Sequence, residues 1–454
     1  MDNYKLSEDI IKAGKAICER HKTVIADTSR PVYHFASPAK MLIDVWGGIL
    51  HKGCYHLFYD INHRVDEENQ GGSFGHLRSQ DLVTWENLPL ALLPDYSVGE
   101  NHLNDGTVVI DPAGNPLMYY TRCFEDMRKN REHLAVRGSD DFISWERIPD
   151  TAITMENHGG PRFHMIWSDP VIFTENGRTF MIISKCTRPD KGDMIPIYEA
   201  VDDTWLKWEY RGVFAEHTGE VLNFIKVKEK WVLIYSPYNN PRYFIGTFDI
   251  DNYKFICEKE GILSYGYISQ GQVTDVSRGF YATSAFYGDD NTAYIVGWIS
   301  GFINPKGWDG CVSLVRTLDI DDNGDLLMMP APQLDKLRMQ KIALDDNLTA
   351  GCGRIFEIDA EFGEGDVLIS VEGSFELKIS ENKIKFNDIE FEYKKGSDIK
   401  VRMYIDVTVA EIFFDGGKIS LTRCFKEISP DALLEVKAKS ITKFDIYKEK
   451  QLYE

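Results

Sequence analysis

The stretch KMLIDVWGGILHKGCYHLFYD, residues 40–60, determines how the rest of the chain is interpreted. Asp44 stands among apolar residues, and a turn at Lys52-Gly53 then leads into an apolar run that ends at Tyr59. Burying a carboxylate beside Trp46 costs several kcal/mol unless the group is paired or used. We therefore expect two adjacent strands that hold an acid, either for function or as a hydrogen-bond acceptor for loop amides.

The same order of acid, turn and apolar strand occurs three more times along the chain. The later acids are Asp105, Asp169 and Glu220, and each of the four stands 15 residues before the end of its apolar run. These runs end at Tyr59, Tyr120, Ser184 and Tyr235. A constant offset indicates a repeated unit that holds a carboxylate in register with a hairpin. We interpret this repeat as the origin of an active site.

A second repeat concerns tryptophan. Segments of the form D-x-x-x-W-E, once with an extra residue, place Trp85, Trp145 and Trp208 at intervals of 60 and 63 residues. A fifth apolar run covers residues 293–298. Five units of about four strands each predict an all-β, five-bladed β-propeller over residues 30–340. Because the first strand of each blade lines the central channel, four carboxylates would converge on one mouth of that channel.

The two ends of the chain follow other patterns. Apolar residues at near-helical spacing follow Ser7, a candidate N-cap, so we expect a short amphipathic helix within an N-terminal extension of residues 1–29. After residue 340, apolar and polar residues alternate in short runs separated by Gly turns. This alternation predicts a C-terminal β-sandwich over residues 341–454.

Composition and charge limit the partners, the cellular location and the cofactors that we expect. The chain is 43% hydrophobic and 27% charged, as in ordinary globular proteins, and its net charge of −20 disfavours nucleic acids and anionic membranes as partners. The sequence has no signal-peptide pattern and no run of ~18 apolar residues, so we expect a cytoplasmic protein. The eight cysteines are scattered without C-x-x-C, which favours reduced thiols over disulfides or a zinc site. No cofactor or metal motif is found, and assembly into a homo-oligomer is left open.

Two carboxylates flanking a sugar bond are the minimum for glycoside hydrolysis, and crowding of acids raises the pKa of at least one of them, as a proton donor requires. We expect Asp44, Asp169 and Glu220 to be functional. The alternatives are a turn acid before proline for Asp169 and an ordinary surface position for Glu220. Asp105 is either a pocket residue or part of a plain Asn-Asp-Gly turn.

Aromatic rings near the acids could stack on sugar faces, although propeller blades also bury many such rings. The candidates are Trp46, Phe74, Trp167, Tyr238, Trp298 and Trp308. His34 and His164 are candidate ligands for sugar hydroxyl groups.

Several longer segments resemble those of one family. Phe74-Gly-His-Leu-Arg-Ser-Gln-Asp-Leu-Val-Thr-Trp is close to the pattern W-G-H-x-x-S-x-D-L-x-x-W. Gly307-Trp-Asp-Gly and Leu314-Val-Arg-Thr-Leu are similar to G-W-x-G and P-R-x-L, and residues 405–417 are similar to V-D-x-S-x-x-E-x-F-x-N-x-G. From Arg30 onward the chain therefore resembles glycoside hydrolase family 32, the invertase-, inulinase- and levanase-type β-fructosidases. The resemblance implies a five-bladed propeller followed by a β-sandwich.

The resemblance also implies a role for each acid: Asp44 as nucleophile, Asp169 as stabiliser of the transition state and Glu220 as acid/base. Their neighbours differ from the family pattern. Asp44 is followed by Val-Trp-Gly rather than Pro-Asn-Gly, Ser168 stands where the family has arginine, and Val-Leu rather than Cys-Pro follows Glu220. Ser168 and Asp105 are therefore further candidate substrate contacts. Because all three acids are kept, we expect catalysis with altered specificity.

The sequence thus predicts a glycosidase without cofactor or metal, acting on a small carbohydrate. The expected substrate is a β-fructofuranoside or a fructose-containing oligosaccharide, and the expected mechanism is retaining. The alternatives left open are an inverting furanosidase or pyranosidase on the same propeller, a fructosyltransferase, and a non-catalytic sugar-binding protein. A carboxylate separation of ~5–5.5 Å would indicate retention, and one of ~6.5–9.5 Å would indicate inversion.

Overall fold

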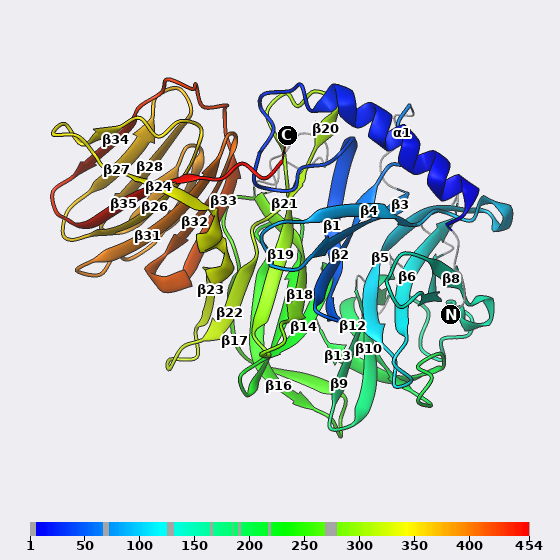
Figure 1. Ribbon diagram of the computed structural model, residues 1–454. Coiled ribbons are helices and arrows are strands. Elements are labelled where there is room, and N and C mark those ends of the chain that lie inside the picture. Colours follow the sequence, from blue (N-terminus) through cyan, green and yellow to red (C-terminus); the bar gives the residue numbers. More distant parts are fainter. Residues whose placement is uncertain are drawn as a thin grey trace.

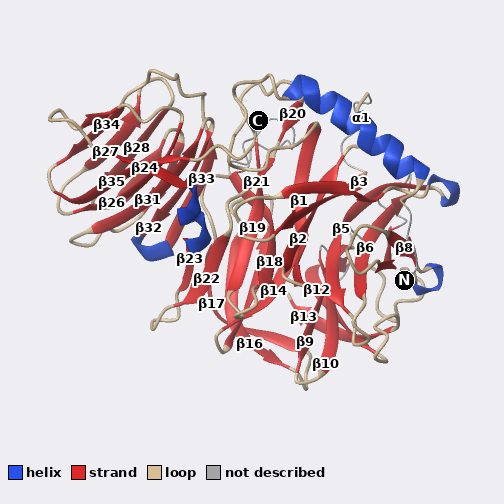
Figure 2. Cartoon of the chain, in the orientation of Figure 1, coloured by secondary structure: helices blue, strands red, loops and turns tan. Residues whose placement is uncertain are grey.

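The computed structural model describes residues 6–66, 72–124, 131–163, 167–184, 186–188, 192–216, 219–267 and 279–453. Strands dominate these residues (Figure 2), so the predicted mostly-β architecture is confirmed. The strands form seven sheets, five between residues 40 and 330 and two built almost wholly from later residues. Figure 1 shows the two C-terminal sheets beside the other five.

The predicted amphipathic helix is confirmed as α1, Glu8–Val24. Ser7 caps its first turn, where the side-chain oxygen accepts a hydrogen bond from the Ile10 amide at 3.2 Å. Acids in the first turn and basic residues in the last turn favour the helix dipole. Ala13 and Ile17 are buried in a cluster shared with the first sheet, so the helix covers that sheet.

Each of the five sheets is built mainly from antiparallel strands that are close together in the sequence. The first contains β1 (Lys40–His51), β2 (Cys54–Ile61), β3 (Ser73–Ser79) and β4 (Glu86–Leu92), and the second contains β5 (Glu100–Ile110), β6 (Pro116–Phe124), β7 (Arg131–Gly138) and β8 (Trp145–Arg147). The third contains β9 (Ser168–Glu175), β10 (Arg178–Ser184), β11 (Cys186–Arg188), β12 (Gly192–Ala200) and β13 (Trp208–Ala215), and the fourth contains β14 (Glu220–Val227), β15 (Lys230–Ser236), β16 (Arg242–Asp249) and β17 (Lys254–Ile262). The fifth contains β18 (Gly279–Tyr287), β19 (Ala293–Ser300), β21 (Cys311–Val312), β22 (Arg316–Ile320) and β23 (Leu326–Pro330).

The first strands of these sheets contact one another in a cycle. β1 contacts β5, β5 contacts β9, β9 contacts β14, β14 contacts β18, and β18 contacts β1 again. The short strand β20 (Trp308–Asp309) comes late in the chain yet runs parallel to β1 in the first sheet. The cycle therefore joins the beginning of this region to its end, and all five first strands line one cavity.

The two C-terminal sheets have six strands each and enclose one hydrophobic core. One contains β24 (Arg338–Ile342), β35 (Ile441–Glu449), β26 (Ile355–Phe362), β31 (Ile399–Asp406), β32 (Val409–Phe414) and β33 (Ile419–Cys424). The other contains β25 (Thr349–Ala350), β34 (Leu434–Ala438), β27 (Val367–Val371), β28 (Phe375–Ser380), β29 (Lys383–Phe386) and β30 (Ile389–Glu392). Short 3₁₀ turns at Tyr96–Val98, Pro149–Thr151, Pro332–Leu337 and Asp415–Gly417 complete the elements.

A buried set of charged side chains joins the C-terminal sheets to the rest. This interface network consists of His34, Arg316, Asp406 and Glu411. His34 bonds Asp406 through Nδ1 and Glu411 through Nε2, both at 2.8 Å, and Arg316 donates two hydrogen bonds to Glu411. The C-terminal region is thus held by charge pairing as well as by apolar contact.

Candidate active site

The acids of the sequence repeat lie in or beside β-bulges near the starts of the first strands. The strand pairing shifts register around Asp44 in β1, around Asp105 in β5 and at the matching point of β9. Asp44 and Asp169 have φ values of 47° and 57°, a left-handed conformation that aspartate tolerates better than most residues. A bulge changes the direction in which the side chain of the extra residue points. The repeat therefore places its acids where the strand is distorted.

The constant offset of 15 has a direct structural explanation. Asp44 lies opposite Tyr59 and Asp60, and Asp105 lies opposite Tyr120 and Thr121, each at the far end of its own hairpin. The offset therefore counts the residues of one hairpin. Glu220 differs, because it pairs directly with Ser236 and the left-handed residue of that bulge is its neighbour Val221.

Glycine makes one of these bulges feasible. A Cβ atom on Gly106 would lie 1.8 Å from the Tyr119 carbonyl oxygen of the next strand. No side chain fits at that distance, so the residue after Asp105 has to be glycine. The Asn-Asp-Gly sequence thus builds a bulge inside a strand rather than a plain turn.

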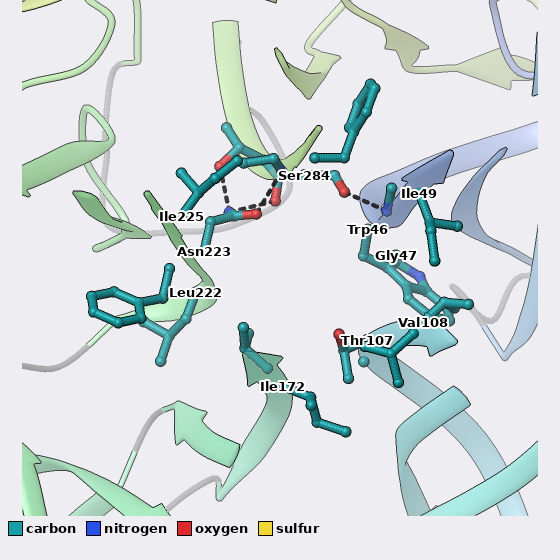
Figure 3. Close-up of a pocket in the computed structure, with 18 of the residues that line it drawn as sticks. Trp46, Gly47, Ile49, Thr107, Val108, Ile172, Leu222, Asn223, Ile225 and Ser284 are labelled. Carbon is teal, nitrogen blue, oxygen red and sulfur yellow. Dashed lines mark hydrogen bonds between the residues drawn. The ribbon is translucent and has the colours of Figure 1, made fainter. Parts of the chain in front are cut away.

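The cavity between the first strands has a volume of about 370 Å³, and Asp105 and Asp169 are among its lining residues. Figure 3 shows Trp46, Asn223 and Ser284 in its wall. Hydrogen bonds between neighbouring strands fix its wall: Asn223 Nδ2 donates to the Thr283 carbonyl at 2.8 Å, and the Gly48 amide donates to Ser284 Oγ at 2.8 Å. Asp44 and Glu220 are partly exposed and do not line this cavity.

Two tyrosines hold Glu220. Tyr238 Oη donates to Oε2 at 2.7 Å, and Tyr281 Oη donates to Oε1 at 2.9 Å. The Tyr238 side chain is 42% exposed, whereas Tyr281 is buried and its hydroxyl pKa is raised by burial and by the Glu220 charge. Both carboxylate oxygens are therefore oriented by hydroxyl donors.

Asp169 is fixed from three sheets. Its Oδ2 accepts from Ser184 Oγ at 2.8 Å and from the Val221 amide at 3.1 Å. Its own amide donates to Thr121 Oγ1 at 3.0 Å. This carboxylate is held in one orientation toward the cavity, as a group that must meet substrate hydroxyls would need to be.

Asp60 belongs to the same group of acids, although the sequence analysis did not single it out. Trp46 Nε1 donates to Asp60 Oδ1 at 3.2 Å. The pKa values of Asp60 and Asp105 are both raised well above the usual range, first by burial and next by the charge of Asp44. The charges of Asp169 and Glu220 also act on Asp105, so the five acids, Asp44, Asp60, Asp105, Asp169 and Glu220, form one electrostatic cluster, here called the site acids.

Most of the candidate aromatic residues are buried in ring clusters. Phe74 and Trp46 pack edge to face at 4.4 Å, and Trp167 packs against His133 at 4.3 Å. Trp298 is 1% exposed, and Trp308 Nε1 donates to Asp27 Oδ2 at 2.8 Å. Of the six aromatic candidates only Tyr238 is an exposed side chain.

The remaining candidates lie in different places. Ser168 is fully buried beside Asp169, and its hydroxyl has no hydrogen-bond partner. His34 belongs to the interface network rather than to the site. His164 lies outside the described residues.

Comparison with known proteins places this arrangement in a family. Residues 34–330 match the model of the N-terminal domain of glycosyl hydrolases family 32. The chain belongs to this family. The predicted resemblance is thereby confirmed, and so is the prediction that the chain is a glycosidase.

The chain is also similar to individual proteins of this family, both in sequence and in fold. The chain is 26% identical over 382 residues to a fructan 6-exohydrolase from Beta vulgaris, a match that covers 76% of this chain and 61% of the beet enzyme's own length. Its fold is similar to that of a sucrose-6-phosphate hydrolase from Lactobacillus gasseri, with a TM-score of 0.82, 19% identity and 97% of both chains covered. A Bombyx mori β-fructofuranosidase solved with sucrose gives a TM-score of 0.79, at 19% identity with 99% of both chains covered.

Within the described ranges, no set of three or more His, Cys, Asp or Glu side chains is arranged to hold a metal ion, the site acids included. In the same part of the chain, no helix combines the length and apolar character needed to cross a membrane.

Proposed function

We propose that the chain hydrolyses a β-fructofuranoside or a fructose-containing oligosaccharide by a retaining mechanism. The observation that carries this proposal is the clustering of carboxyl groups from consecutive first strands in a member of glycosyl hydrolases family 32: Asp105 and Asp169 line one cavity, and the charges of Asp44 and Glu220 act on Asp105 beside it. The names of the beet, bacterial and silkworm relatives, all hydrolases of fructose-containing sugars, support the substrate class.

The five sheets serve in this proposal as the blades of a five-bladed propeller. The cycle of contacts among the first strands and the single cavity that they line support that arrangement. Residues 30–340 would be the catalytic domain, 341–454 a β-sandwich domain and 1–29 an N-terminal extension. The cytoplasmic location and the assembly state stay predictions from the sequence.

In the proposed reaction, Asp44 attacks the anomeric carbon and the bond to the leaving oxygen breaks as Glu220 donates its proton to that oxygen. Glu220, now a carboxylate, takes a proton from water, and the resulting hydroxide displaces Asp44 from the sugar. Asp169 would accept hydrogen bonds from ring hydroxyls as positive charge develops. Tyr238 and Tyr281 would keep Glu220 pointed at the leaving group in both steps.

An uncharged sugar suits this site better than a phosphorylated one. Within the described part of the chain, no Lys or Arg is among the residues that line the cavity, whereas two carboxyl groups are. A phosphate group near the site acids would meet like charge without a described cation to balance it. We therefore expect sucrose or a fructan rather than a sugar phosphate as substrate.

A hydrolysis screen tests the proposal directly. Sucrose, 1-kestose, inulin and levan oligosaccharides, difructose anhydrides, sucrose 6-phosphate and aryl arabinofuranosides are incubated with the protein, with Asp44→Ala as the inactive control. Release of fructose with retained anomeric configuration in the first NMR spectra supports the proposal. Inversion, or binding without release, would point to the inverting or the non-catalytic alternative.

A further inference from the structure

Two buried polar side chains of the second sheet have no role in the proposed mechanism. Thr121 of β6 and His133 of β7 are both fully buried and lie opposite each other on these neighbouring strands. On its other side Thr121 pairs with Asn104, at the bulge of β5 that holds Asp105. A hydroxyl group and an imidazole ring therefore lie at the level of the site acids without contributing to the reaction as described above.

A chain of hydrogen bonds joins this pair to Asp169. The Asp169 amide donates to Thr121 Oγ1 at 3.0 Å, and Thr121 Oγ1 lies 3.2 Å from His133 Nδ1. A backbone N–H can only donate, so the Thr121 oxygen accepts from Asp169 and its own hydrogen can be given to His133. The chain then runs from β9 through β6 to β7, and each hydrogen bond in it has one direction.

This direction requires one tautomer of His133, with the proton on Nε2. In the described structure Nε2 is buried and has no hydrogen-bond partner. A proton on Nδ1 instead would also deprive the Thr121 hydroxyl of its acceptor, so it would leave two groups unsatisfied rather than one. Burial lowers the pKa of His133 to about 3, and the ring is therefore neutral at ordinary pH. His133 acts as a neutral acceptor for the Thr121 hydroxyl.

Asp169 has a backbone conformation that needs such support. Its φ of 57° is left-handed, and a residue other than glycine keeps this conformation only where its surroundings hold it. Ser184 and the Val221 amide hold the carboxylate, whereas Thr121 holds the backbone through the amide. Without the Thr121 hydroxyl, the Asp169 amide would lose the group that accepts its hydrogen bond.

The same arrangement recurs in another pair of sheets. Ser236 Oγ of β15 accepts a hydrogen bond at 3.1 Å from the amide of Ala282 in β18, and Ala282 is also left-handed, with a φ of 42°. Thr121 and Ser236 each lie on the second strand of a sheet, and each accepts from the first strand of the next sheet. In two places, therefore, a hydroxyl group of one sheet holds the distorted strand of the following one.

We propose that Thr121 is a positioning residue for Asp169 and that His133 fixes the direction of the Thr121 hydroxyl. This inference rests on the proposed function, in which Asp169 accepts hydrogen bonds from ring hydroxyls. Trp167 packs edge to face against His133, with ring centroids 4.3 Å apart, and so holds the imidazole from the third sheet. In this proposal Thr121 and His133 act through Asp169 and do not touch the sugar.

Substitutions of Thr121 separate a positioning role from a purely structural one. Thr121→Val keeps the shape of the side chain and removes its hydroxyl. We expect it to lower kcat about 10²-fold on the best substrate of the screen, with a smaller change in KM, because a misplaced Asp169 loses contacts that matter most in the transition state. Thr121→Ser keeps the hydroxyl and should have a kcat close to that of the wild type.

Thr151→Val is the matched control. Thr151 Oγ1 is also buried and also accepts from a backbone amide, that of Ala135 in β7, at 3.1 Å. The two valine variants should therefore lose similar amounts in melting temperature, whereas only Thr121→Val should lose kcat.

Substitutions of His133 test the second part of the proposal. In His133→Asn the side-chain oxygen can take the place of Nδ1 as acceptor, and kcat should stay close to that of the wild type. His133→Leu has no acceptor and should lower kcat about tenfold, as for one lost hydrogen bond. Equal values of kcat for these two variants would show that His133 does not act through the Thr121 hydroxyl.

The outcomes that overturn the proposal are distinct from failure of the proposed function. If Thr121→Val lowers kcat no more than Thr151→Val, or if Thr121→Ser is as impaired as Thr121→Val, the hydroxyl does not position Asp169. A crystal structure of Thr121→Val without substrate should show Asp169 outside the left-handed region or without its bonds to Ser184 and Val221, and unchanged geometry would overturn the proposal even if sugars are hydrolysed. If no furanoside is hydrolysed, the proposed function fails, whereas a displaced Asp169 in that crystal structure would still support the positioning role.

Discussion

Two of the regions in which the chain buries carboxyl groups surround them in opposite ways. In the interface network, Glu411 and Asp406 are surrounded by donors and cations, with Arg316 and His34 on one side and three backbone amides on the other. Among the site acids, Asp60 and Asp105 face other acids. Burial alone would raise the pKa of Glu411, but Arg316 and His34 hold it below its usual range; among the described residues, the charges that act most on the pKa of Asp105 are those of other acids and raise it. In the interface network compensated charge holds the two parts of the molecule together, whereas among the site acids the charge is left for chemistry.

The largest expected effect is a loss of kcat when a catalytic residue among the site acids is replaced. Asp44→Ala and Glu220→Gln should each lower kcat by on the order of 10⁴-fold on the best substrate of the screen, because each removes a group that forms or breaks a bond. The melting temperature should change little, since both side chains are partly exposed. Steady-state kinetics and thermal unfolding measure the two effects.

Glu209→Gln provides the matched control, because this glutamate is an exposed partner of Arg211 on the outer part of the third sheet. Its activity should equal that of the wild type. Turnover within tenfold of wild type in either site variant would contradict the assignment of Asp44 or Glu220.

In the interface network we expect a large effect on stability rather than on catalysis. Glu411→Ala leaves Arg316 buried without its carboxylate and His34 bonded to Asp406 alone, which should lower the free energy of unfolding by about 3–5 kcal/mol. Glu376→Ala removes a carboxylate that pairs with Lys378 on the surface and should cost less than about 1 kcal/mol. Denaturant unfolding compares them, with Glu411→Gln as the milder variant if alanine prevents folding. Equal losses at the two positions would mean that the network adds no more than a surface pair.

The interface network also predicts a pH dependence. Burial alone would lower the pKa of His34, but the hydrogen bonds that its ring donates to Asp406 and Glu411 raise the pKa from 6.5 to about 9. A group with a raised folded-state pKa contributes stability that is complete below pH 6.5 and is lost as the pH rises through 9. Wild-type protein should therefore lose a few kcal/mol of stability between pH 6.5 and 10 relative to His34→Gln. Parallel curves for the two proteins over this range would show that His34 is not charged in the fold.

Sequence patterns revealed the part of the site that repeats. The offset of 15 is the length of a hairpin, and hairpins of equal length place Asp44 and Asp105 at equivalent bulges. Asp60 was missed because it ends a strand, where a single acid has no periodic signal, although its position opposite the Asp44 bulge follows once the pairing is known. Tyr281 was missed because only the contact between β14 and β18 brings it to Glu220.

The aromatic candidates gave a sequence signal, but that signal did not indicate their role. Trp167 and Phe74 stand next to site residues in sequence or space, yet their rings complete clusters between sheets. Apolar rings give the same sequence signal whether they face a sugar or a neighbouring blade, so only side-chain packing separates the two roles. His34 was likewise indistinguishable from a site histidine until Asp406 and Glu411, more than 370 residues away, were placed beside it.

A smaller effect on activity concerns the orientation of Glu220. Tyr238→Phe removes one of its two hydroxyl donors and should lower kcat about tenfold, the effect of one hydrogen bond to a charged group. Tyr253→Phe is the control, since the Tyr253 hydroxyl donates to Glu199 and is not among the described residues that line the cavity. A kcat equal to that of the wild type would leave Tyr238 without a role in orienting Glu220.

The smallest expected effect tests whether uncompensated charge is costly to the fold. The pKa of Asp60 is raised from 3.8 by burial and by Asp44, so its contribution to stability is complete below pH 3.8 and falls as the pH rises. Asp60→Asn cannot ionise but keeps an oxygen for the Trp46 indole, and it should therefore raise the free energy of unfolding by about 1 kcal/mol at pH 7 and not at pH 4. The corresponding change in the interface network, Asp406→Asn, should be destabilising, because it weakens the bonds to three amides and to His34. Opposite signs for the same substitution in the two regions would tie the difference to charge compensation, since both aspartates are buried.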